Sequence, residues 1–193
     1  MSDVTADKAN LLLGALGEQL AAADEQFELV VIGGSALLAL GLIERTTRDV
    51  DIVALRSGED LESADPLPEA LRAARDLVAR DFSLPPRWLD PGPTKLLEFG
   101  LPQGFAKRLE RRDYGPGLVV YFASRLDQIH FKLYAAVDEG GPGKHESDLR
   151  ALAPTAAELV AAARWSRSHD PSPAYAQELR GALKFLGVTD VDL

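Results

Sequence analysis

Two aspartates separated by a single residue, Asp49 and Asp51, are the side chains of this sequence whose type and spacing best fit metal chemistry. Side chains two residues apart on a β-strand project from the same face, roughly 7 Å apart by the standard rise. Two carboxylates so placed repel each other, and a divalent cation such as Mg²⁺ or Mn²⁺ would relieve that repulsion. The pair predicts a metal site. The alternative is that Asp49 only begins a strand and Asp51 faces solvent.

A glycine turn, Gly33-Gly34-Ser35, lies between an apolar strand-like segment and a helix-length apolar segment just before the aspartates. Glycines permit a sharp turn and let a phosphate approach the backbone. The unpaired N–H groups of a helix start favour an anion, and Ser35 could cap that helix or donate its hydroxyl to a phosphate oxygen. Taken alone, the turn could be a plain strand-to-helix connection. Together, turn and carboxylates predict a nucleoside triphosphate site.

The combined pattern Gly33-Gly34-Ser35, then Arg45-x-Thr47-x-Asp49-Val50-Asp51, resembles the signature of the DNA polymerase β-like nucleotidyltransferase superfamily. Within it, the chain is similar to small bacterial nucleotidyltransferase-like proteins that include abortive-infection type toxins of toxin–antitoxin systems. Those proteins typically add a lysine in a later helix and an aspartate in a following Asp-Leu element. Lys132 and Asp148 stand at these places, and the likeness spans about residues 27–152.

The resemblance implies a role for each of these residues. Asp49 and Asp51 would ligate the metal, and the implied catalytic residues are Asp49, Asp51, Lys132 and Asp148. The implied nucleotide-binding residues are Gly33, Gly34, Ser35, Arg45, Arg48 and Lys132. Lys132 could instead lay its stem on apolar surface with its ammonium in water, and Asp148 could merely decorate a helix.

One departure from the family pattern concerns a third carboxylate, which many active members carry on a later strand. The strand expected over residues 118–123 contains no acid, and Glu98 and Asp127 are the remaining candidates.

The implied reaction moves an NMP from an NTP to a hydroxyl acceptor with release of pyrophosphate. The acceptor is an RNA end, a protein side chain or a small molecule. Two rivals stay open. One is a catalytically inactive binding module of the same fold that acts by contact with a cognate small partner protein. The other is a small-molecule, antibiotic-type nucleotidyltransferase, which needs an acid-lined pocket for its second substrate, built from the region 139–146 and the C-terminal helices.

Composition restricts the setting. The chain has 193 residues, 46% hydrophobic and 26% charged, and no cysteine, which excludes disulfides and thiolate metal sites and favours the cytoplasm. The net charge of −9 argues against broad nucleic-acid binding, and the interrupted basic cluster at residues 108–112 predicts a solvated helix face. The longest apolar run, 29–43, is too short to span a membrane, and the N-terminus does not resemble a signal peptide. We expect no membrane partner.

Hydrophobic periodicity and turn residues predict an α+β (mixed α/β) fold, a small mixed β-sheet of nucleotidyltransferase type flanked by helices, with a helical C-terminal part. The expected strands are 27–32, 50–55 and 118–123. The expected helices are 8–23, 35–42, 67–80, 124–137, 146–152, one that begins after Thr155 and one that begins at Pro173. Residues 56–65 are expected to form a loop, and 82–104 an irregular segment with a short strand near 96–99. We expect a nucleotidyltransferase-like domain over 1–153 and a helical extension over 154–193 that packs on it.

Overall fold

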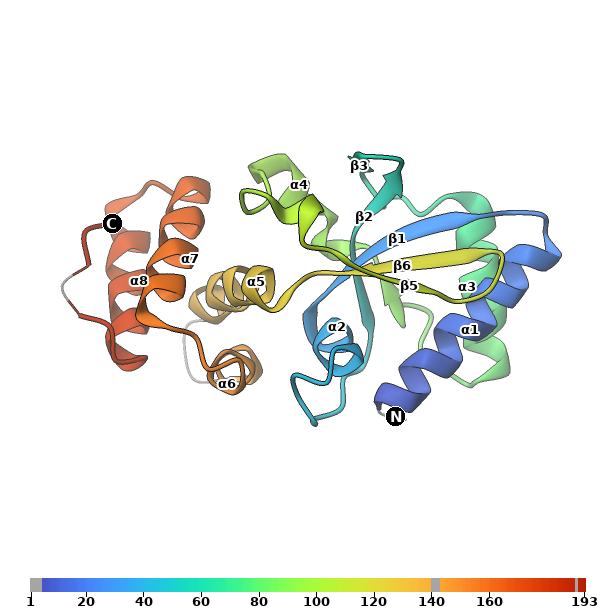
Figure 1. Cartoon of the computed structure of the whole chain (residues 1–193), viewed down its shortest axis with the longest axis horizontal. Coiled ribbons are helices and arrows are strands. Elements are labelled where there is room, and N and C mark those ends of the chain that lie inside the picture. The colour runs from blue at the N-terminus through green and yellow to red at the C-terminus, as the bar shows by residue number, and fades with distance from the viewer. Residues whose placement is uncertain (1–4, 140–142, 190) are drawn as a thin grey trace. The chain divides into compact units, whose positions relative to one another are not determined.

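The structure is a computed structural model that describes residues 5–139, 143–189 and 191–193. It has a mixed α+β fold (Figure 1), as the sequence predicts. Two compact units divide the chain, Met1–Ser124 with the β-sheet and Arg125–Leu193 with helices alone. The domain boundary expected after residue 153 lies inside the second unit and stays a prediction. In the described residues, none of the helices combines the length and the apolar character that crossing a membrane requires.

A mixed β-sheet forms the centre of the first unit, with its strands in the order β3-β2-β1-β6-β5. A further strand, β4, pairs with β2 in parallel. The central strand β1 is antiparallel to β2 and parallel to β6. The strands are β1 (Phe27–Ile32), β2 (Val50–Ser57), β3 (Asp60–Glu62), β4 (Leu89–Asp90), β5 (Glu110–Asp113) and β6 (Leu118–Phe122).

Helices of the first unit bury their apolar faces against the sheet and against each other. The first helix places leucines at positions 12, 13, 16 and 20, the spacing of one helix face, and all four are buried. It contacts α2, α3 and β6. The helical segments of this unit are α1 (Ala6–Ala22), α2 (Gly33–Ala39), α3 (Glu69–Asp81), α4 (Leu96–Phe99) and the 3₁₀ turns η1 (Gly92–Lys95) and η2 (Phe105–Lys107).

Strand β2 directs the Asp51 side chain to the face opposite Val50 and Ile52, and Asp49 lies immediately before the strand. Val50 and Ile52 are fully buried, whereas Asp51 between them is half-buried, as period-two alternation predicts. The β1–β2 register shifts between Val30 and Val31, and the last pair joins Ile32 to Asp51. Asp51 therefore lies beside the residue that precedes the glycine turn.

Three local predictions were wrong. Residues 56–65 are not a loop, because β2 continues to Ser57 and turns into β3 at Gly58, whose φ of +64° suits a tight turn. The proline-rich segment places its short strand at β4 and forms a helix at α4, where a strand was expected. The basic cluster is not a helix face, because residues 110–113 form the edge strand β5. At β3, β4 and β5, pairing with a neighbouring strand overrides a weak local preference.

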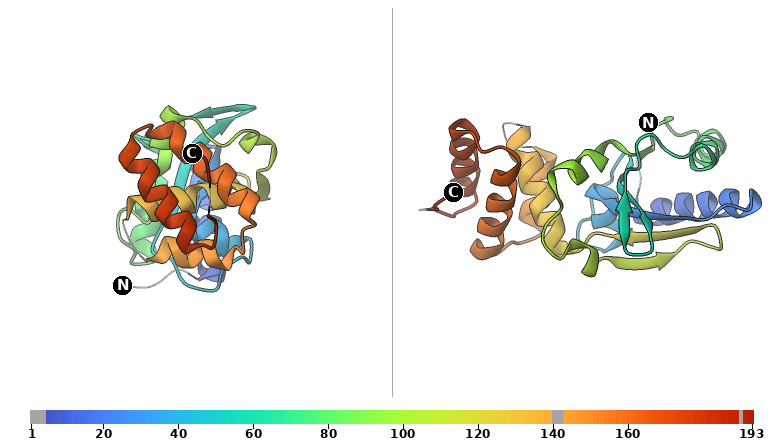
Figure 2. Two further views of the ribbon diagram at one scale, coloured as in Figure 1. Left: turned by 90° about the vertical axis from the view of Figure 1, so that its left-hand side faces the viewer. Right: turned by 90° about the horizontal axis from the view of Figure 1, so that it is seen from above.

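The second unit is a set of helices in which α5 packs against the other three (Figures 1 and 2). Its helices are α5 (Arg125–Asp138), α6 (Lys144–Ala151), α7 (Ala156–His169) and α8 (Pro173–Phe185). The predicted helix starts are confirmed: Thr155 and Glu158 form a reciprocal capping box, and the Ser172 hydroxyl accepts the N–H of Tyr175. Side chains at the helix starts thus hold these two boundaries.

Candidate active site

The glycine turn and the second aspartate of the pair are in direct contact. Gly33 has a φ of +75°, a backbone conformation that side-chain-bearing residues rarely adopt. A Cβ at this position would overlap Oδ2 of Asp51 and lie 3.1 Å from its Cγ. Only glycine satisfies both conditions, so the Asp51 carboxylate lies against the backbone of the turn.

The next glycine faces the segment that leads into the aspartates. A Cβ on Gly34 would lie 2.9 Å from Oγ1 of Thr47 and 3.5 Å from Nη2 of Arg45. Thr47 is buried, and its hydroxyl donates to Oδ1 of Asp49 across 3.4 Å. The turn is therefore linked to both carboxylates, to Asp51 directly and to Asp49 through Thr47.

Ser35 presents a polar atom that the described chain leaves unsatisfied. The residue is 2% exposed, and its Oγ has no hydrogen-bond partner among the described residues. It does not cap α2, because Ile32 occupies the cap position and no side chain caps that helix. Leaving a buried hydroxyl unpaired costs about 1–3 kcal/mol, which a ligand oxygen placed here would recover. Since α2 has 7 residues, its dipole adds little, and the turn backbone and this hydroxyl are the groups available to an anion.

The aspartates fit a hard divalent cation. Asp49 immediately precedes β2, Asp51 lies within it, and both are half-buried. Within the ranges that the structure describes, no group of three or more acidic, histidine or cysteine side chains could hold a metal. Mg²⁺ commonly uses one or two carboxylates and completes its shell with substrate phosphates and water. The two carboxylates beside the glycine turn fit that requirement.

Among the described residues, neither candidate for a third carboxylate joins the aspartate pair in a group that could hold a metal. Glu98 is exposed on α4, and Asp127 is fully buried in α5 of the helical unit. An acid that the sequence analysis did not consider, Asp90, is paired with Asp51 in the parallel β4–β2 register. Its Oδ1 accepts hydrogen bonds from Gly92 N–H and from Arg87, both at 3.1 Å. A two-residue strand among prolines has no periodicity, so only the pairing reveals this neighbour.

The two arginines proposed for phosphate differ in their surroundings. Arg45 is half-buried beside Gly34 and donates from Nη1 to the carbonyl of Thr46 at 3.0 Å. Arg48 is exposed. Arg45 therefore has the more defined position against the turn, a distinction that the sequence did not make.

In the helical unit, the structure brings Lys132 and Asp148 together. The Lys132 Nζ lies 2.7 Å from Oδ2 of Asp148, and the two side chains are 4% and 1% exposed. The lysine does not hold its ammonium in water, and the aspartate does not decorate a helix surface. A buried ion pair is costly to desolvate and demands close geometry, so it ties α5 to α6 specifically.

His145 borders this ion pair. Burial lowers the pKa of His145, and the positive charge of Lys132 lowers it further, against the opposing effect of Glu139. Its Nε2 lies 3.3 Å from Oε1 of Glu139. These effects favour the neutral form of the imidazole.

The sequence around this site is similar to a known protein family. Residues 12–142 match the family described as "Nucleotidyltransferase of unknown function (DUF6036)". The chain belongs to this family. Neither a curated protein nor a solved structure matches it.

The DUF6036 match covers the site of the first unit completely. It includes the glycine turn, both aspartates and Lys132, and ends before Asp148. Family membership confirms the resemblance at the level of a nucleotidyltransferase-like family. Helices α6, α7 and α8 follow the matched segment, so they are the part of this chain that the family description does not cover.

Proposed function

We propose that this DUF6036 member is a metal-dependent nucleotidyltransferase that moves an NMP from an NTP to a hydroxyl acceptor. The observation that carries the proposal is the packing of Gly33 against the Asp51 carboxylate. This contact places the turn suited to phosphate beside the side chains suited to a divalent cation. The family description supports the same class of reaction.

Different residues of the first unit bind the triphosphate and the metal. The backbone of Gly33 and Gly34 and the hydroxyl of Ser35 bind the triphosphate tail, and Arg45 balances its charge. Asp49 and Asp51 ligate Mg²⁺ or Mn²⁺, which when bound neutralises phosphate charge and favours the deprotonated acceptor oxygen. Thr47 orients Asp49 through its hydrogen bond. Positioning and charge neutralisation are the main sources of rate enhancement in such a site.

The proposed chemistry is a single in-line displacement. The acceptor oxygen forms a bond to the α-phosphorus, and the bond from that phosphorus to the bridging oxygen breaks. Pyrophosphate leaves with the bonding electron pair, and the proton of the acceptor hydroxyl passes to solvent. The chain needs no oxidant or reductant for this step.

Label position in the NTP tests the reaction. The protein is incubated with each NTP, labelled at the α- or the γ-phosphate, together with Mg²⁺ or Mn²⁺ and a cell extract. We expect transfer of the α-label alone and release of pyrophosphate. Transfer of the γ-label would identify a kinase instead, and would overturn the proposal.

Matched variants test the site. Asp49→Asn with Asp51→Asn should abolish transfer while retaining the fold, as circular dichroism and the thermal midpoint would show. Asp60→Asn, an exposed aspartate on β3, is the control for loss of one carboxylate from the sheet. Transfer that survives in the Asp49/Asp51 variant would contradict the assigned roles.

The inactive binding module predicts a different result. It would bind nucleotide in a Mg²⁺-dependent manner, measurable by calorimetry, and yield no product with any NTP or extract.

The resemblance to abortive-infection toxins further suggests that the protein is the toxin of a toxin–antitoxin system. It predicts growth arrest on expression, relieved by the Asp49/Asp51 substitutions and by a cognate small partner protein.

A further inference from the structure

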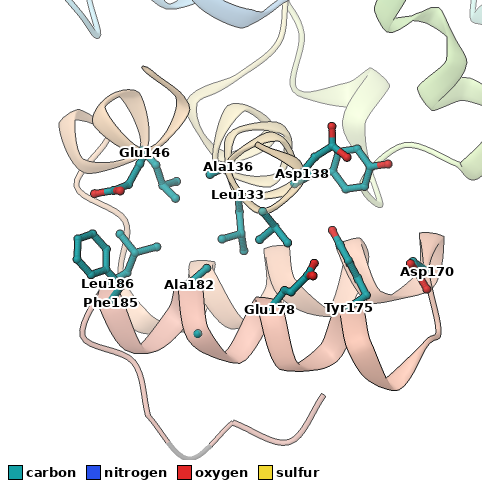
Figure 3. A pocket seen from close by; sticks show the side chains of 14 residues that line it. Leu133, Ala136, Asp138, Glu146, Asp170, Tyr175, Glu178, Ala182, Phe185 and Leu186 are labelled. Carbon is teal, nitrogen blue, oxygen red and sulfur yellow. The ribbon is translucent and has the colours of Figure 1, made fainter. Parts of the chain in front are cut away.

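The helical unit contains a pocket that the nucleotide chemistry does not use. Helices α5, α6 and α8 line an open pocket of about 670 Å³ (Figure 3), a volume within the range of sites for small molecules. We name it the acidic pocket, because its lining includes the carboxylates of Asp138, Glu146, Asp170 and Glu178. The lining residues include no lysine, arginine or histidine.

Apolar and aromatic side chains form the body of the acidic pocket. Leu133 points from α5 toward α8, and Tyr175 and Glu178 extend from α8 toward α5 (Figure 3). Phe185 is 60% exposed, a large apolar surface left in contact with water. A ligand for this site must therefore offer an apolar body as well as a charge.

At one end of the acidic pocket, an aromatic ring and a carboxylate already hold a cation of the protein itself. The Arg150 guanidinium lies 4.7 Å from the centre of the Phe185 ring, and its Nε is 2.7 Å from the Glu146 carboxylate. A cation held between an aromatic ring and a carboxylate gains from both contacts.

The other end has the same kinds of groups without the cation. Tyr175 and Tyr134 supply the rings, and Asp138 and Glu178 supply the carboxylates. In the described part of the chain, neither of these two acids forms an ion pair. Burial raises the pKa of Tyr134, and the negative charges of Asp138 and Asp170 raise it further.

We propose that the acidic pocket binds a small organic cation with an apolar body, such as an aryl-alkyl amine. The ammonium would lie at the end formed by Asp138, Tyr175 and Glu178, and the apolar body along Leu133 toward Phe185. This site shares no residue with the one assigned to the nucleotide, and the proposal does not depend on nucleotidyl transfer.

Two probes of equal shape test the proposal. The full chain is titrated at pH 7 with 4-phenylbutylamine and with 4-phenylbutanol, by calorimetry and by NMR. We expect the amine to bind about ten-fold more tightly, since it makes two ion pairs, with Asp138 and Glu178, that the alcohol cannot make. Added salt should weaken binding of the amine and leave binding of the alcohol unchanged. Equal binding of the two probes, or no saturable binding of the amine at millimolar concentration, would overturn the proposal.

Variants locate the site. Asp138→Asn with Glu178→Gln should weaken amine binding about five-fold or more, because both proposed ion pairs are lost. Glu18→Gln, an exposed acid on α1, should have no effect. The Asp49/Asp51 variant should bind the amine normally, which separates this proposal from the proposed catalysis. Unchanged amine affinity in the Asp138/Glu178 variant would show that the pocket is not the binding site.

Discussion

Gly33 and Asp51 are packed so closely that no side chain fits between them. The backbone of Gly33 is left-handed, and the position of its missing Cβ overlaps the Asp51 carboxylate. This contact lies at the end of the β1–β2 pairing, where Ile32 is paired with Asp51. The glycine is thus required twice, once for the turn and once for the carboxylate.

Gly33→Ala should therefore do more damage than the backbone conformation alone explains. We expect a loss of about 1–2 kcal/mol from the left-handed strain, and displacement of Asp51 that abolishes Mg²⁺-dependent NTP binding. Urea unfolding and calorimetry measure the two effects. Gly41→Ala is the matched control, because Gly41 has a φ of +69° and open space around its missing Cβ. Equal effects of the two substitutions on NTP binding would contradict the role of the contact.

Ser35→Ala should separate stability from binding. Removal of a buried hydroxyl that has no partner in the described chain should stabilise the fold by about 1 kcal/mol. The same change should weaken NTP binding about ten-fold, through loss of a hydrogen bond to a charged phosphate.

Ser166→Ala is the control for the stability measurement, because the buried Ser166 hydroxyl has a hydrogen-bond partner. Ser166 is fully buried, and its hydroxyl lies 2.5 Å from the Tyr175 hydroxyl, so we expect that substitution to destabilise the protein. A Ser35→Ala protein that is less stable and binds NTP normally would refute a phosphate role for Ser35.

The buried pair of Lys132 and Asp148 calls for a double-mutant cycle. Lys132→Met alone should cost about 3–5 kcal/mol, because it leaves the Asp148 carboxylate buried without its cation. Adding Asp148→Leu should recover most of that loss, since two apolar side chains can replace a buried pair. Chemical denaturation measures the free energy of unfolding of the wild type, the two single variants and the double variant.

The same cycle tests the catalytic role that the resemblance assigns to the pair. If the pair acts in the reaction, the double variant regains stability and stays inactive. A double variant that regains both stability and transfer activity would show that the pair is purely structural.

Acid stability should depend on Glu158. Hydrogen bonds from Arg125 and from the Thr155 backbone lower the pKa of Glu158 from 4.5 to about 2. A group whose pKa is lower in the folded state stabilises the protein above its unfolded pKa. That contribution is lost as the pH falls from about 5 to 2.

Glu158→Gln should therefore reduce stability at pH 7 by about 1–2 kcal/mol, after allowance for solvent screening of this partly exposed pair. The difference from the wild type should shrink below pH 4. Urea titrations at pH 7, 4 and 3 would show it, with Glu18→Gln as the exposed control. A constant difference across these pH values would contradict the assignment.

The sequence alone predicted those elements that residues close together along the chain determine. The strand with Val50 and Ile52 inward, the capping box at Thr155 and Glu158, and the strand over residues 27–32 all follow from periodicity or from local hydrogen bonds. The nucleotidyltransferase signature was readable for the same reason, because its residues are close together along the chain.

The tertiary structure decided what depends on partners distant in sequence. Pairing with β2 turned Leu89–Asp90 into a strand and placed Asp90 in register with Asp51. Pairing with β6 made an edge strand of a charged segment that alone is typical of a helix face. The packing of α5 on α6 buried Lys132 against Asp148, and that of α5 with α8 contributed to the acidic pocket. Local propensity amounts to a few tenths of a kcal/mol per residue, whereas burial and strand pairing contribute more, so such features appear only once the chain is folded.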